Sequence, residues 1–217
     1  MRPWPSVLLA LSILASTVSA HTPQRYLALG DSYTIGEGVA DKDRWPEQWA
    51  RALRAHGVDT APPRIIARTG WTTDELSAAM DAAEPLGHWD RVSLLIGVNN
   101  QYRGRDLDNY RKQFTALLDR AIELAGGHAA NVWVLSIPDW GVTPFARASG
   151  RDQAHIAHEI DAFNAIAQQV SKSHGAHWVD ITDISRKQGA RVPMLVDDGL
   201  HPSGAMYSLW VERIMAP

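Results

Sequence analysis

The chain contains no cysteine among its 217 residues. This absence excludes disulfide bonds, cysteine-ligated zinc, iron–sulfur clusters and a cysteine nucleophile. No charge of one sign dominates, because 21 Lys and Arg residues stand against 24 Asp and Glu residues, for a formal net charge of -3. No basic run or stripe is present, so we expect no nucleic-acid partner. Hydrophobic residues make up 45% of the chain and charged residues 21%, which is typical of a globular domain.

Long hydrophobic runs are also missing, apart from one near the N-terminus. There Arg2 precedes the apolar segment Val7–Ala15, and the small-residue segment Val18–Ala20 follows it. A positive start, a short apolar centre and small residues before a cleavage point predict a secretory signal peptide over residues 1–20, cut after Ala20. The alternative is a membrane anchor, but a span needs roughly 20 apolar residues and this run is shorter.

Cleavage at that point makes residues 21–217 a single mature domain without a stable membrane span. We therefore expect a secreted or periplasmic protein. Export without any cysteine is more typical of a bacterial periplasm or the external medium than of a eukaryotic secretory route.

Short apolar runs alternate with helical patterns along the rest of the chain. Five runs are almost continuously apolar, as in strands covered on both faces. These predicted strands are Tyr26–Leu29, Arg64–Ala67, Val92–Ile96, Val132–Ile137 and His177–Ile181. Strand and helix in repeated alternation predict a single-domain α/β fold, with a five-stranded parallel sheet between two helical layers.

The predicted helices lie between these strands and after the last one. Their signals are a proline at a first helical position, a capping-box spacing, and apolar stripes at helical period. The helices are expected to begin at Pro46, to follow Thr72 as far as Met80, to cover 107–125 and 152–173, and to run from Pro202 or Ser203 to Ile214.

Polar residues and glycines follow three of the predicted strands. Gly30-Asp31-Ser32 comes after the first strand, Gly70 just after the second and Asn99 just after the third. Open parallel sheets bind ligands at the carboxyl ends of their strands. A serine at a helix start can attack a carbonyl while its own N–H stabilises the oxyanion that forms.

A fourth group lies ahead of the last predicted helix, where Asp198 precedes His201 by three residues. An acid at this spacing on a tight loop can reach the imidazole and fix its tautomer, and His201 can then take the proton of Ser32. Each group alone also fits a simple turn or a loop leading into a helix. Their joint occurrence, in one order and at predicted strand ends, favours an active site.

With these residues in place, the chain resembles the GDSL-type, or SGNH, hydrolases, which are named for block residues Ser, Gly, Asn and His. The blocks match here as Ser32, Gly70, Asn99 and the Asp198–His201 segment. The resemblance implies a flavodoxin-like fold and a catalytic triad of Ser32, His201 and Asp198. It also implies an oxyanion hole formed by the Ser32 and Gly70 N–H groups and the Asn99 side chain, and it requires no cofactor and no metal.

Two positions depart from the family pattern. Tyr33 stands where the family name has leucine, and we expect it to pack rather than react. Asn100 replaces the aspartate of the usual Gly-x-Asn-Asp block. That aspartate is not a triad member, and asparagine keeps hydrogen-bonding capacity while losing the charge.

Metal chemistry is the main competing interpretation of the histidine content. His155 and His158 lie at helical spacing beside Glu159. Their order matches neither His-Glu-x-x-His nor its inverse, and no third ligand is evident. We therefore expect a solvated helix face and no metal site. The sequence also lacks a Gly-x-Ser-x-Gly nucleophile elbow.

The expected activity is ester hydrolysis through an acyl-serine, on short acyl esters or lysophospholipid-like lipids. Two alternatives remain: a carbohydrate O-acetyl esterase or acyltransferase using the same acyl-serine, and a non-catalytic carbohydrate- or lipid-binding protein. Trp71, Trp140 and Phe145 are candidate substrate contacts, and a partly apolar loop over residues 138–150 is expected to help form the pocket. Chain length, the alcohol group and oligomeric state stay open.

Overall fold

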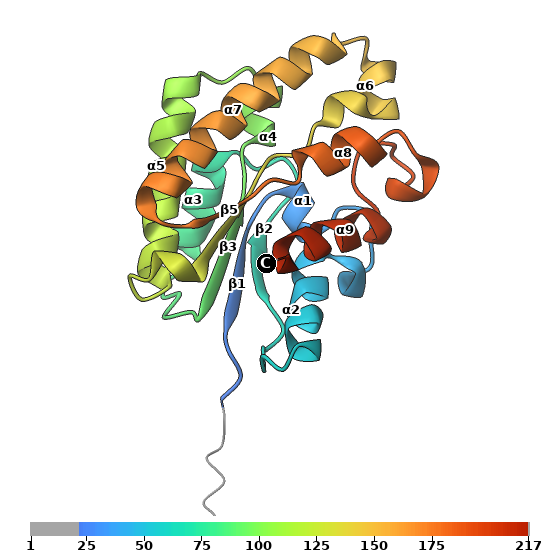
Figure 1. Cartoon of the computed structure of the whole chain (residues 1–217). Coiled ribbons are helices and arrows are strands. Elements are labelled where there is room, and N and C mark those ends of the chain that lie inside the picture. The colour runs from blue at the N-terminus through green and yellow to red at the C-terminus, as the bar shows by residue number, and fades with distance from the viewer. Residues whose placement is uncertain (1–21, 217) are drawn as a thin grey trace, which may run out of the picture.

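The computed structural model describes residues 22–216, which fold around one five-stranded sheet (Figure 1). The strand order is β2-β1-β3-β4-β5, and every pair of neighbours is parallel. The strands are β1 Tyr26–Gly30, β2 Arg64–Ala67, β3 Arg91–Leu95, β4 Val132–Leu135 and β5 His177–Val179. The predicted five-stranded parallel sheet is therefore confirmed.

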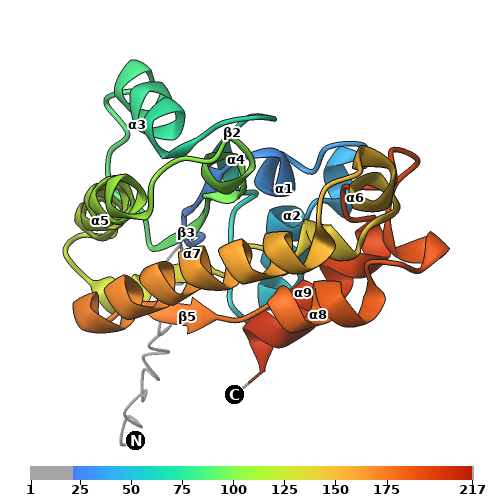
Figure 2. The ribbon, with the colours of Figure 1, turned by 90° about the horizontal axis from the view of Figure 1, so that it is seen from above.

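Helices cover both faces of this sheet, which completes the predicted three-layer α/β/α architecture (Figures 1 and 2). Helices α2 and α9 pack together on one face, and α3, α5 and α7 pack together on the other. The helices are α1 Ser32–Ile35, α2 Trp45–Ala55, α3 Thr73–Ala82, α4 Val98–Tyr102, α5 Leu107–Leu124, α6 Pro144–Ser149, α7 Gln153–His174, α8 Thr182–Gln188 and α9 Gly204–Met215. Short 3₁₀ turns are η1 Asp41–Asp43, η2 Ala129–Asn131, η3 Trp140–Val142 and η4 Val192–Met194.

The central strands form the core because their residues are apolar on both faces. All five residues of β1 are buried, as are the last four of β3. Tryptophan fills the layer between the sheet and the α2–α9 pair, where Trp45, Trp49 and Trp210 are almost fully buried. Burial of side chains this large contributes about 1.5–3 kcal/mol each, which anchors both helices to the sheet.

Strands β4 and β5 are shorter than the sequence predicts. The apolar runs continue to Ile137 and Ile181, but the Ser136 hydroxyl accepts hydrogen bonds from the N–H groups of Ile181, at 2.7 Å, and Thr182, at 3.1 Å. The Ser136 hydroxyl thus satisfies N–H groups that would otherwise pair between the two strands. Each strand therefore ends two residues before its apolar run does.

The predicted signal peptide, residues 1–20, lies outside the described residues. Across residues 22–216, no helix is both long and apolar enough to cross a membrane.

Candidate active site

The residues singled out in the sequence converge at the carboxyl end of the sheet, where α1, α4 and α6 also lie (Figures 1 and 2). Ser32, Gly70, Asn99 and His201 all line one pocket with a volume of about 160 Å³. These four residues come from the segments after β1, β2 and β3 and from the loop before α9. The parallel sheet brings them together because its strands all end at the same edge.

Ser32 occupies the first position of α1, directly after β1, and is 4% exposed. Asp31 caps this helix, since its side chain accepts a hydrogen bond of 3.0 Å from the Tyr33 N–H. No hydrogen-bond partner for the Ser32 N–H occurs among residues 22–216. A free N–H beside a hydroxyl is the arrangement that an oxyanion-binding nucleophile needs.

Gly70 adopts a backbone φ of +89°, a conformation that favours glycine over any residue with a side chain. Its carbonyl accepts a hydrogen bond of 2.7 Å from Arg103, which fixes the orientation of the following peptide. In the described part of the chain the Gly70 N–H, like that of Ser32, has no protein acceptor.

Asn99 lies in α4, which begins after a glycine whose backbone conformation disfavours any side chain. Gly97 has φ of +130°, and an added Cβ would lie 2.8 Å from both Ile137 and Tyr110. The Asn99 amide donates one hydrogen bond of 2.9 Å to the Trp71 carbonyl. An amide nitrogen carries two hydrogens, so one remains for a ligand in the pocket.

Asn100, which stands in place of the family's aspartate, is fully buried and faces the start of α3. Its Oδ1 accepts from the Thr73 N–H at 3.1 Å, and its Nδ2 donates to the Thr73 hydroxyl at 2.7 Å. Donor and acceptor capacity are both used, so the neutral amide joins α4 to α3 without burying a charge.

His201 and Asp198 lie on the tight loop before α9. The imidazole Nδ1 lies 2.5 Å from Asp198 Oδ2, while the other carboxylate oxygen accepts from the N–H groups of Leu200, at 2.8 Å, and His201, at 2.9 Å. Burial raises the pKa of Asp198, but these hydrogen bonds more than offset it and hold the pKa below its ordinary value. The Asp198 carboxylate is therefore ionised and is hydrogen-bonded to Nδ1 of His201. This pairing leaves Nε2 as the imidazole nitrogen available to Ser32.

No hydrogen bond joins Ser32 to His201 in the part of the chain that the structure describes. Catalytic contacts of this kind often tighten only when substrate binds. Tyr33 packs under the imidazole, with ring centroids 5.8 Å apart, and is 3% exposed. Its buried position agrees with the expected packing role.

The carboxyl group of Asp31 is fully buried beside Ser32, an environment that disfavours its ionised form. One of its oxygens, Oδ2, has no hydrogen-bond partner among residues 22–216. Burial raises the pKa of Asp31 to about 7, against smaller opposing effects from backbone hydrogen bonds. The folded protein therefore holds a proton here that the unfolded chain releases near pH 4.

We expect Asp31→Asn to flatten the pH dependence of stability between pH 4 and 7. Because the folded pKa lies above the unfolded one, the folded state binds more protons in this interval, and the free energy of unfolding falls as pH rises. Asparagine keeps the Tyr33 acceptor and does not ionise. Urea unfolding at several pH values measures the slope, with Asp106→Asn, at the exposed cap of α5, as the control. Identical slopes in Asp31→Asn and the parent chain would contradict the assignment.

Apolar side chains form the rest of the pocket wall. Trp140 and Phe145, both expected as substrate contacts, line the pocket, whereas Trp71 is not among the lining residues and packs partly buried against the core. Four further lining residues were not predicted from the sequence, namely Thr69, Val98, Tyr102 and Leu200. Each is next to a block residue in the sequence or lies with Asn99 in the short helix α4. Closeness to a block residue would therefore have predicted its place in the pocket wall.

The histidines considered as metal ligands, His155 and His158, lie on the exposed surface of α7. His155 contacts Glu159 at 3.2 Å on the surface of α7. Within residues 22–216, no cluster of three or more histidine or acidic side chains is arranged to hold a metal ion.

The comparison with known families identifies the family of the chain. The GDSL-like lipase/acylhydrolase family model matches residues 28–209, which is most of the chain. The chain therefore belongs to the GDSL-like lipase/acylhydrolase family. No curated protein matches it significantly.

Solved structures resemble it in fold at low sequence identity. The crystal structure of TesA is 19% identical, with a TM-score of 0.69 over 88% of this chain and 96% of that one. A lipase/acylhydrolase from Enterococcus faecalis is 21% identical, with a TM-score of 0.68 over 88% and 93%. A mutant of Axe2, an acetyl-xylooligosaccharide esterase from Geobacillus stearothermophilus, is 19% identical, with a TM-score of 0.68 over 88% of this chain and 92% of that one.

Proposed function

We propose that this protein is an exported serine ester hydrolase that cleaves carboxylic esters through an acyl-enzyme. The observation that carries the proposal is the shared pocket of Ser32, Gly70, Asn99 and His201, with Asp198 bound to the far side of the imidazole. The family assignment supports an acylhydrolase chemistry. Export is supported by the N-terminal sequence pattern alone.

Each residue has one role in the proposed mechanism. Ser32 Oγ attacks the ester carbonyl while His201 Nε2 takes its proton, and Asp198 stabilises the imidazolium that results. The negative charge that develops on the carbonyl oxygen is held by the N–H groups of Ser32 and Gly70 and by the Asn99 amide. Collapse of the tetrahedral intermediate releases the alcohol, which receives the proton from His201.

Water completes the reaction. His201 then removes a proton from a water molecule, which attacks the acyl-serine and forms a second tetrahedral intermediate in the same oxyanion hole. Its collapse returns the free acid and restores Ser32. A sugar hydroxyl in place of water would give acyl transfer.

The test is hydrolysis of p-nitrophenyl esters from acetyl to palmitoyl by the chain without residues 1–20. We expect turnover of at least the shorter esters without added metal. Acetylated xylo-oligosaccharides, assayed with and without a sugar acceptor, distinguish hydrolysis from transfer through the products formed. Absence of turnover on every ester and acylated sugar would overturn the proposal.

A further inference from the structure

Trp140 is the largest side chain of the pocket wall, and separate contacts fix its backbone and its indole ring. It lies in η3, at the start of the connection between β4 and α7, and is 2% exposed. Its ring lies 5.4 Å from that of Tyr102 and 6.2 Å from that of Phe145, measured between centroids. A side chain this size can limit the depth of the pocket only if it cannot move aside.

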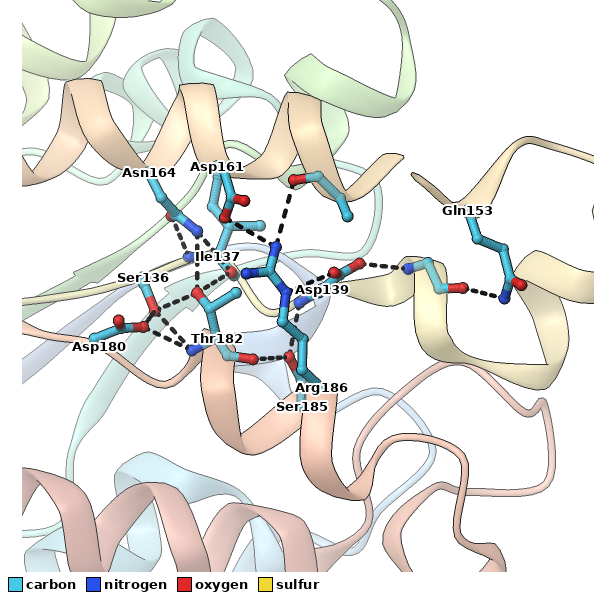
Figure 3. Close-up of polar contacts among 12 residues, drawn as sticks. Ser136, Ile137, Asp139, Gln153, Asp161, Asn164, Asp180, Thr182, Ser185 and Arg186 are labelled. Atoms are coloured by element: carbon cyan, nitrogen blue, oxygen red, sulfur yellow. Dashed lines mark hydrogen bonds and ion pairs between the residues drawn. The ribbon is translucent and has the colours of Figure 1, made fainter. Parts of the chain in front are cut away.

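The backbone around Trp140 is fixed by the buried carboxylate of Asp139, which pairs with the partly exposed Arg186 (Figure 3). The Asp139 carboxylate, 1% exposed, accepts from the Gly141 N–H at 2.8 Å and from Arg186 Nε at 2.9 Å. Arg186 also reaches Asp161 on α7 at 2.8 Å. Because the carboxylate binds the backbone on one side and α8 on the other, the turn that carries Trp140 cannot shift without unpairing a buried charge.

The indole itself is fixed by a polar chain that reaches the protein surface. Trp140 Nε1 donates to Gln101 Oε1 at 2.8 Å, and Gln101 Nε2 donates to Glu159 Oε2 at 2.7 Å. An indole only donates and an ionised carboxylate only accepts, so the Gln101 amide can have just one orientation. Gln101 is 4% exposed, and this pairing is therefore costly to break.

The size of the pocket shows what a fixed Trp140 would exclude. Its volume is about 160 Å³. An apolar cavity of roughly 150 Å³ is known to take a benzene molecule, which has six carbon atoms. An acyl group of about six carbons would therefore fill the space, and Trp140 is the largest side chain that bounds it.

We propose that Gln101 is a specificity-determining positioning residue, which holds Trp140 as the inner wall of the acyl pocket and restricts the enzyme to short acyl groups. The proposal rests on the ester hydrolase function above and names its substrate class. Gln101 acts through Trp140 and does not take part in bond making. Its removal should therefore alter which ester is preferred, with a smaller effect on turnover of the best one.

The experiment compares kcat/KM for p-nitrophenyl decanoate with that for the butyrate, at one pH, in each variant. The ratio of the two values cancels any loss of folded protein, which a merely structural role would cause. We expect a low ratio in the parent chain and a rise of about tenfold or more in Trp140→Ala, since a pocket wall commonly discriminates methylene groups to this extent. Gln101→Leu, which keeps the volume but loses both hydrogen bonds, should raise the ratio in the same direction.

A charge swap and a surface variant provide the controls. Gln101→Glu alone places two carboxylates together and should behave like Gln101→Leu. Combined with Glu159→Gln it restores both hydrogen bonds, with the new glutamine donating to the new glutamate, and the parent ratio should return. His155→Ala removes the exposed contact at the far end of Glu159 and should leave the ratio unchanged.

Two results would overturn the inference while leaving the hydrolase function intact. One is an unchanged ratio in both Trp140→Ala and Gln101→Leu. The other is a changed preference among alcohols, measured with butyrate esters, without a changed preference among acyl groups. Failure of the parent chain to hydrolyse any ester would instead reject the proposed function, and the inference with it.

Discussion

Ser32→Ala is expected to abolish ester hydrolysis, with a loss in kcat of at least about 10⁴-fold. The reason is that alanine has no hydroxyl at the position of the proposed nucleophile, so the acyl-enzyme does not form. The residual rate would come from the oxyanion donors and from substrate binding alone. Steady-state kinetics on p-nitrophenyl butyrate measure the loss.

The substitution is not expected to unfold the protein. Ser32 holds the first position of α1, and the helix cap depends on Asp31 and the backbone of Tyr33, which alanine leaves in place. Ser173→Ala, on the exposed end of α7, is the matched control and should keep full activity. Retained hydrolysis in Ser32→Ala would reject the acyl-serine mechanism.

Asn99→Ala is expected to lower kcat by about 10²–10³-fold, the usual cost of losing one oxyanion donor. The Asn99 amide donates one hydrogen to the Trp71 carbonyl at 2.9 Å, and in the proposed mechanism it donates the other to the developing oxyanion. Because the second bond strengthens in the transition state, KM should change much less than kcat. Kinetics with one short ester separate the two parameters.

Asn109→Ala provides the matched control, since Asn109 is an exposed asparagine near the start of α5. It should leave both kcat and KM unchanged. Thermal unfolding of Asn99→Ala tests whether the lost Trp71 contact has a separate effect on stability. Near-normal kcat in Asn99→Ala would remove its side chain from the oxyanion hole.

Patterns that repeat over many residues made the fold predictable. The buried strands β1 and β3 appear as continuous apolar runs because both faces of a parallel sheet are covered. The long helices α5 and α7 appear as apolar stripes, and their observed ends agree with the predicted ones within two residues. The capping box at Thr72 and Glu75 is present at the start of α3, because its two partners are local in the sequence.

The segment 138–150 shows where such patterns fail. Its apolar residues predict only a loop, yet it contains the turn η3 and the six-residue helix α6. These elements are too short for a periodic signal. They are held by side-chain caps from Asp139 and Thr143, and Asp139 is itself held by Arg186, 47 positions along the chain. Local sequence patterns do not predict a contact between residues that far apart in the chain.

The sequence by itself determined the layered fold and predicted the candidate block residues, because both depend on local order along the chain. Only the tertiary structure decided which side chains share the pocket. It placed Trp140 on the wall and Trp71 away from it, although each follows a strand closely. It also buried Asp31 and joined Gln101 to Glu159 across 58 positions. The physical reason is that burial and hydrogen bonding depend on neighbours in space, which residue order does not specify.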